Sequence, residues 1–227
     1  MSKTNLKVIL LGNKASGKTS IINQYINKEF SYEYLMTIGQ DKLIKTIIVD
    51  NIKLTLNIWD TAGQEKFAEV NKIFMKNSDI IILVYDITNK NSFESLNKWY
   101  EEIKNHINID NVIICVAANK SDLYIEEAVS LDTAKEYCNT INSLLIETTA
   151  IDYDSINNLF NTIVMEYYNK FIKINKNEIK NKKDNVNYNK DENENDNEYE
   201  KKEQISLSSI NSKIKDEKNN YKKNTCC

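Results

Sequence analysis

Up to about Lys170, the chain alternates between two patterns of hydrophobic and polar positions. Short continuous apolar runs are typical of buried strands, whereas longer segments with apolar residues every three to four positions are typical of amphipathic helices. The runs predict strands at residues 7–11, 43–49, 54–59, 80–85, 112–117 and 144–148. The longer segments predict helices at about 18–27, 66–77, 92–107, 131–142 and 154–170.

The order of these elements predicts an α/β fold. Asp50 and Asn51 separate the second and third strands and favour a tight turn that makes the pair antiparallel. The other strands alternate with helices, so we expect a mostly parallel six-stranded sheet with one antiparallel strand and helices on both faces. In such sheets ligands bind beyond the carboxyl ends of the strands.

Composition divides the chain into two parts. Residues 1–170 hold the predicted elements and form one domain, whereas residues 171–227 are rich in Lys, Asn, Asp and Glu. The second part buries too little apolar surface to offset the entropy of ordering, so we expect a disordered tail. The net charge of −3 gives no sign of nucleic-acid binding, and no apolar run approaches the roughly 20 residues that cross a bilayer.

The first chemical motif follows the first strand and opens the first helix. Gly12, Gly17, Lys18 and Thr19 fit the phosphate-loop pattern G-x-x-x-x-G-K-[ST]. Backbone N–H groups of such a loop surround phosphate, the lysine reaches the β- and γ-phosphates, and the hydroxyl binds Mg²⁺. An ordinary strand-loop-helix turn is the alternative interpretation, but the flanking elements favour the phosphate loop.

The second motif follows the third strand. Asp60 is placed to hold Mg²⁺, Gly63 to donate its N–H to the γ-phosphate, and Gln64 to orient an attacking water. This motif is weak alone but strong beside a phosphate loop.

The third motif, Asn119-Lys120-Ser121-Asp122, follows the fifth strand. The Asp122 carboxylate can accept hydrogen bonds from N1 and the 2-amino group of guanine, a pattern that adenine does not offer. Asn119 and Lys120 would brace this loop and cover the base. The structural alternative is an ordinary solvated turn. The functional alternative is an ATP-dependent P-loop kinase, which would leave Asp122 unexplained.

In this order and spacing the motifs resemble the Ras-like small GTPases, and the segments between them resemble the Rab family. The resemblance covers residues 6 to about 170 and implies slow hydrolysis of bound GTP to GDP with Mg²⁺. By this resemblance Phe30 packs on guanine, while Thr37 binds both Mg²⁺ and the γ-phosphate. The expected site residues are, for phosphate, Lys14, Ala15, Ser16, Gly17, Lys18, Thr19, Thr37 and Gly63; for guanine, Phe30, Asn119, Lys120, Asp122, Thr149 and Ala150; for Mg²⁺, Thr19, Thr37 and Asp60; and for catalysis, Gln64.

Several positions depart from the family pattern. Lys14 replaces a small residue near the γ-phosphate, where its bulk either displaces Gln64 or rotates outward harmlessly. Lys42 stands where Rab proteins place an aromatic residue that effectors contact beside Trp59 and Phe74. The loop with Thr149 and Ile151 resembles the family's E-T-S-A-K, with Thr for Ser and Ile for Lys, and we expect lower affinity with unchanged base specificity.

The chain contains no arginine and therefore has no arginine finger of its own. We expect turnover on the order of 10⁻⁴ s⁻¹ that an activating protein accelerates ~10⁵-fold. A hydrolysis-impaired, persistently GTP-bound scaffold for effectors is the alternative that Lys14 raises.

The tail predicts a lipid anchor. Cys226 and Cys227 resemble the Rab signal for two geranylgeranyl groups, and residues 205–210 resemble the aliphatic segment that docks on the prenylation escort protein. Chance alternation in a biased tail is the alternative for that segment. The resemblance implies GTP-state effectors, an exchange factor, a GTPase-activating protein and a GDP-dissociation inhibitor as partners. It also implies the cytoplasmic face of an intracellular membrane as the location, with a cytosolic pool and a role in vesicle traffic.

Overall fold

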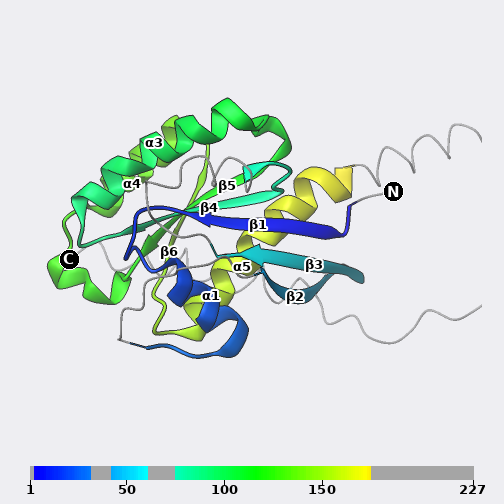
Figure 1. Cartoon of the computed structure of the whole chain (residues 1–227), viewed down its shortest axis with the longest axis horizontal. Coiled ribbons are helices and arrows are strands. Elements are labelled where there is room, and N and C mark those ends of the chain that lie inside the picture. Colours follow the sequence, from blue (N-terminus) through cyan, green and yellow to red (C-terminus); the bar gives the residue numbers. More distant parts are fainter. Residues whose placement is uncertain (1–2, 32–41, 61–74, 175–227) are drawn as a thin grey trace, which may run out of the picture. The chain divides into compact units, whose positions relative to one another are not determined.

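A computed structural model of the chain describes residues 3–31, 42–60 and 75–174 (Figure 1). The described strands form one six-stranded sheet in the order β2-β3-β1-β4-β5-β6. Neighbouring strands pair in parallel except β2 and β3, which are antiparallel. The strands are β1 (Asn5–Leu11), β2 (Lys42–Val49), β3 (Ile52–Trp59), β4 (Ile80–Asp86), β5 (Ile113–Asn119) and β6 (Leu144–Glu147). The predicted fold class is therefore confirmed.

The β2–β3 hairpin turns as the sequence predicts. Asp50 and Asn51 have φ values of 46° and 60°, and Asp and Asn tolerate this left-handed conformation better than most residues. β2 is the outer strand of the described sheet, and its side chains alternate between exposed and half-buried. Ile44 and Ile48 lie on its solvent side with exposed fractions of 59% and 72%.

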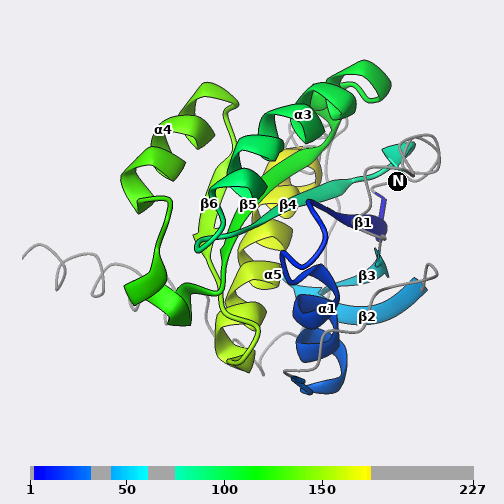
Figure 2. The ribbon, with the colours of Figure 1, turned by 60° about the vertical axis from the view of Figure 1, so that its left-hand side comes forward.

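Helices cover both faces of the sheet (Figures 1 and 2). The α-helices are α1 (Lys18–Asn27), α3 (Lys90–His106), α4 (Leu131–Thr140) and α5 (Tyr153–Tyr167). Shorter helical segments are η2 (Ile109–Asn111), η3 (Ser121–Glu126) and the π-helical η4 (Tyr168–Lys173). None of the described helices is both long and apolar enough to span a bilayer.

Two apolar clusters, one on each face of the sheet, hold the helices in place. β4 is buried along its whole length because its side chains alternate between them. Ile80, Ile82 and Val84 belong to the cluster under α1 and α5, and Ile81, Leu83 and Tyr85 to the cluster under α3.

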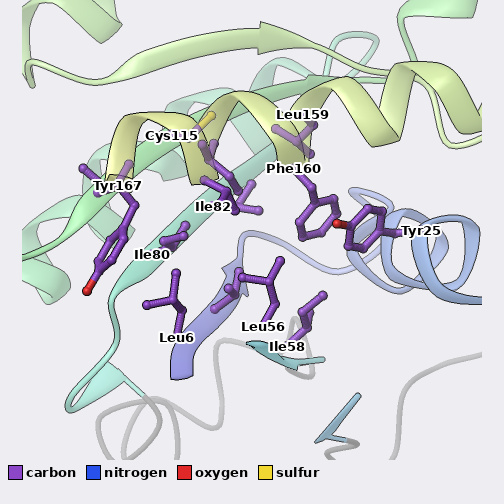
Figure 3. Packing of buried hydrophobic residues seen from close by; sticks show 14 of the residues in the cluster. Leu6, Tyr25, Leu56, Ile58, Ile80, Ile82, Cys115, Leu159, Phe160 and Tyr167 are labelled. Carbon is purple, nitrogen blue, oxygen red and sulfur yellow. The ribbon is translucent and has the colours of Figure 1, made fainter. Parts of the chain in front are cut away.

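The cluster under α1 and α5 joins these two helices directly. Figure 3 shows Tyr25 of α1 beside Phe160 of α5, and their rings stack with centroids 3.7 Å apart. Cys115 is buried in the same cluster and Cys138 in the opposite one.

The boundaries of several elements differ from the predicted ones. β1 begins two residues earlier, at Asn5, because pairing with β3 continues to the Asn5–Thr55 register. β5 extends to Asn119, which pairs with Asp86. Helical structure continues through η4 to Lys173, where Tyr168 and Ile172 are buried. Most of the predicted helix 66–77 and the tail from residue 175 lie outside the described residues, so the tail's disorder stays a prediction.

Candidate functional site

The loop between β1 and α1 requires glycine at both ends because its backbone passes close to other groups. Gly12 has φ +146°, and a Cβ there would lie 2.1 Å from the Val84 carbonyl oxygen. Gly17 has φ +95° and is the N-cap of α1; a Cβ there would lie 2.1 Å from Nδ2 of Asn119. The loop therefore folds tightly over the ends of β4 and β5 and leads into the N-terminus of α1, a geometry that suits an anion.

Lys18 is buried under this loop. Its Nζ donates hydrogen bonds to the carbonyl oxygens of Gly12, at 2.8 Å, and Asn13, at 2.7 Å. Desolvation lowers the pKa of the Lys18 ammonium to about 8, although the nearby Asp60 carboxylate acts in the opposite direction. A desolvated cation thus lies next to the predicted phosphate position.

Thr19 and Asp60 bring two oxygen ligands together across the sheet. Thr19 is on the first turn of α1 and Asp60 directly follows β3, which is the parallel neighbour of β1. The Thr19 hydroxyl donates to Oδ2 of Asp60 at 2.8 Å. A hydroxyl and a carboxylate are ligands that Mg²⁺ accepts, so the pair fits this ion.

Asn119 connects the phosphate loop to the predicted base-binding loop. Its side chain is buried at the end of β5, and its Nδ2 donates to the Ser16 carbonyl at 2.8 Å. The Thr148 hydroxyl donates to Oδ1 of Asn119 at 3.4 Å. One amide therefore links three segments that lie far apart in the sequence.

Lys120 and Asp122 follow Asn119 in the same loop and have different partners. Lys120 adopts a left-handed conformation with φ 64°, and its ammonium pairs with the Asp86 carboxylate at 2.5 Å. Asp122 is exposed and accepts a hydrogen bond from the Thr149 hydroxyl at 2.5 Å. The structure thus places the predicted base-contacting carboxylate beside the loop that contains Ala150.

The remaining predicted guanine-side residues are Phe30, Thr149 and Ala150. Ala150 is buried, and Thr149 N–H donates to the Ser155 hydroxyl at 3.0 Å, which fixes the loop on the start of α5. Gln24 of α1 donates to the Ile151 carbonyl at 2.9 Å. Phe30 is half-buried and packs against the core cluster under α1 and α5.

The structure adds contacts that the sequence reasoning did not identify. Oδ1 of Asn13 accepts a hydrogen bond from the Trp99 indole N–H at 3.3 Å, and its Nδ2 donates to the Ser95 hydroxyl at 2.9 Å. Asp86 binds Lys120 and also accepts from the N–H and hydroxyl of Thr88. The position of Asp86 at the carboxyl end of a buried strand was the signal in the sequence, because site residues gather there.

Other predicted residues are exposed or lie outside the described parts of the chain. Lys14 and Ala15 are exposed on the loop, and Ala15 has φ 62°. Lys42 is exposed and pairs in register with Trp59. The predictions that fall outside the described residues concern Thr37, Gly63, Gln64, Phe74, Cys226 and Cys227.

Comparison with known proteins agrees with this geometry. The family model described as "Ras family" matches residues 7–169. The chain is 36% identical to Ras-related protein RABA4d of Arabidopsis thaliana over 162 residues, which cover 71% of this chain and 72% of the relative. It is 39% identical to Ras-related protein Rab-7a of Dictyostelium discoideum over 165 residues, covering 71% and 81% respectively. Ras-related protein Rab11A of Lotus japonicus is 34% identical over 163 residues, with 72% of each chain covered. The chain therefore belongs to the Rab family of Ras-like small GTPases.

Proposed function

We propose that this protein is a membrane-bound switch that binds GTP or GDP with Mg²⁺ and hydrolyses GTP slowly. Membership of the Rab family supports guanine-nucleotide binding, GTPase activity and a general role in vesicle traffic. The observation that carries the proposal is the hydrogen bond from the Asn119 side chain to the Ser16 carbonyl. It connects the predicted base-binding segment to the phosphate loop. This bond supports a single site in which the predicted phosphate-binding and base-binding segments are held together.

On the phosphate side, the N–H groups of residues 14–19 would surround the phosphates. Lys18 would exchange its bonds to the Gly12 and Asn13 carbonyls for phosphate oxygens. Phosphate charge would favour its ammonium form and reverse the effect of desolvation on its pKa. Thr19 and Asp60 would hold Mg²⁺, with Thr37 as a further ligand; when bound, the ion neutralises phosphate charge.

On the base side, Asp122 would accept hydrogen bonds from N1 and the 2-amino group of guanine. Thr149 already donates to this carboxylate and would keep it oriented. Phe30, Lys120 and Ala150 would line the rest of the base pocket. This contact would select guanine over adenine, because an adenine nucleotide would leave the carboxylate without these donors.

Exchanging Asp122 for asparagine tests the base assignment. An Asn side chain presents one acceptor and one donor, which match N1–H and the 2-oxo group of xanthine. The full-length Asp122→Asn protein should therefore lose GDP and retain xanthosine diphosphate, measured by displacement of a fluorescent nucleotide. Retention of GDP at wild-type affinity, or preference of the wild type for ADP, would refute the assignment.

Hydrolysis is tested by single turnover of GTP on the full chain, with Gln64→Leu as the matched variant. We expect a rate on the order of 10⁻⁴ s⁻¹ because the chain has no arginine to stabilise the transition state. Gln64→Leu should abolish this turnover. An activating protein that supplies an arginine should accelerate the wild type.

A second candidate function rests on Lys14, which is exposed on the phosphate loop. If its side chain displaces Gln64, the protein would be a persistently GTP-bound scaffold for effectors. In that case wild type and Gln64→Leu would be equally inert, and Lys14→Ser would restore turnover. A slow wild-type rate that Lys14→Ser leaves unchanged would exclude the scaffold.

For the tail we propose that Cys226 and Cys227 carry two prenyl groups, with residues 205–210 docking on the escort protein. One lipid chain gives only marginal membrane binding, so two would be needed for stable anchoring. The anchored protein would meet effectors, an exchange factor, a GTPase-activating protein and a GDP-dissociation inhibitor at the cytoplasmic face of an intracellular membrane. Replacing both cysteines with serine should move the cellular protein from membranes to the soluble fraction, and an unchanged distribution would contradict the anchor.

A further inference from the structure

Asn13 is a phosphate-loop residue whose side chain turns away from the phosphate position. Both ends of its side-chain amide form hydrogen bonds with α3. The partners are Ser95 and Trp99, which lie 82 and 86 positions further along the chain. Figure 2 shows the loop between β1 and α1 next to α3. Trp99 lies on the buried side of α3 with an exposed fraction of 7%, and Ser95 lies one helical turn before it.

The chemistry of the partners fixes the orientation of this amide. The Trp99 indole N–H can only donate, so the group facing it must be the Asn13 Oδ1. Nδ2 then points to the Ser95 hydroxyl, which accepts this bond and donates its own hydrogen to the Asn91 carbonyl at 2.7 Å. The result is a continuous chain of hydrogen bonds from Trp99 through the phosphate loop and back into α3.

The backbone of Asn13 takes part in the phosphate cradle itself. Its carbonyl accepts hydrogen bonds from the Lys18 ammonium at 2.7 Å and the Ser16 N–H at 3.3 Å. Any rotation of the Asn13 peptide would therefore move the carbonyl that positions Lys18. The two side-chain bonds to α3 oppose that rotation.

We propose that Asn13, Ser95 and Trp99 form a clamp that holds the phosphate loop against α3 and slows release of the bound nucleotide. This inference rests on the proposed function, because it concerns the retention of GDP. Asn13 acts as a positioning residue through the loop backbone. A loop already held in its binding conformation loses less entropy when it closes on phosphate, so loosening it should speed dissociation.

The test measures dissociation of fluorescent GDP from the full-length protein after addition of excess GDP. Asn13→Ala removes two hydrogen bonds and should raise the dissociation rate about tenfold, whereas Trp99→Phe removes one and should raise it about threefold. The double variant should be no faster than Asn13→Ala alone, because both changes break the same connection. Asn13→Asp should stay within about threefold of wild type, since it keeps an acceptor for Trp99 and the Ser95 hydroxyl can turn to donate.

Ser130→Ala is the matched control for a general loss of stability. Ser130 caps α4, outside the clamp, by accepting a hydrogen bond from the Thr133 N–H. This variant should unfold at a lower temperature than the wild type and keep the wild-type dissociation rate. Ser95→Ala provides a second probe of the clamp if Trp99→Phe folds poorly.

Three results would overturn the clamp. The first is release of GDP by Asn13→Ala at the wild-type rate, and the second is release by Ser130→Ala as fast as by Asn13→Ala. The third is a double variant whose acceleration equals the product of the two single accelerations. They differ from failure of the proposed function, in which the wild type itself would not retain GDP and both ideas would fall. A wild type that retains GDP, with variants that release it at the same rate, would remove the clamp alone.

Discussion

Replacing Lys18 with methionine should make the nucleotide-free protein more stable at neutral pH while it abolishes nucleotide binding. Lys18 is a buried ammonium whose pKa falls from the ordinary value of 10.5 to about 8, chiefly through desolvation. A difference of about 2.5 pH units corresponds to about 3 kcal/mol by which the folded state disfavours the charged form of Lys18 relative to its neutral form. Methionine has a similar length, forms helices well and carries no charge.

The pH dependence follows from the sign of this shift. Below about pH 8 the side chain is protonated in both the folded and the unfolded chain, so the full cost is present. Between about pH 8 and 10.5 the unfolded chain binds more protons, so stability of the wild type rises with pH relative to the variant. The advantage of Lys18→Met should therefore shrink from about 3 kcal/mol at pH 7 to about 1 kcal/mol at pH 9.5.

Urea unfolding of the nucleotide-free proteins at these two pH values provides the measurement. Burial also raises the pKa of the Cys115 thiol and lowers that of Lys7, but both effects are shared by the two proteins and cancel in the difference. A Lys18→Met protein that is less stable at pH 7 would refute the reasoning. So would a stability difference that does not change with pH.

Three other substitutions test separate parts of the structure. Gly12→Ala should lower the free energy of unfolding by about 3 kcal/mol, because its Cβ would lie 2.1 Å from the Val84 carbonyl oxygen; a wild-type urea midpoint would contradict this. Tyr25→Phe should raise the free energy of unfolding by about 1 kcal/mol, since the Tyr25 hydroxyl is fully buried without a hydrogen-bond partner in the described structure. A lower urea midpoint would count against that explanation. Asn89→Ala should cost about 1 kcal/mol by removing the N-cap bond that the Ser92 N–H donates, and Asn89→Asp, which keeps the acceptor, should not.

The parts of the site that the sequence predicts correctly depend on local chemistry. The Gly12–Thr19 loop needs glycine where the backbone passes close to β4 and β5, and this requirement is visible as fixed spacing in the sequence. Asp60 follows β3 and Asn119 ends β5, and the carboxyl ends of such strands meet at one edge. The contacts of Thr37 and Gln64 stay predictions, since both residues lie outside the described parts of the chain.

The parts that the sequence did not predict depend on packing between distant segments. The Asn13–Trp99 bond joins residues 86 positions apart and forms only because α3 packs beside the phosphate loop. The Lys120–Asp86 pair has the same origin in the pairing of β4 with β5. The end of η4, residues 171–173, was missed for another reason: the polar composition that begins near Lys170 hides the buried Ile172.

The outer position of β2 has a consequence for how the isolated protein behaves at high concentration. Within the described sheet this strand pairs only with β3, so its other edge presents backbone groups that another strand could bond. The exposed Ile44 and Ile48 add apolar surface to that strand, whereas the exposed Lys42 adds repelling charge. At 0.1 M salt such repulsion is largely screened beyond about 10 Å. Colloidal stability of the purified protein should therefore decrease as ionic strength rises, with strand-to-strand association at β2 as the physical cause.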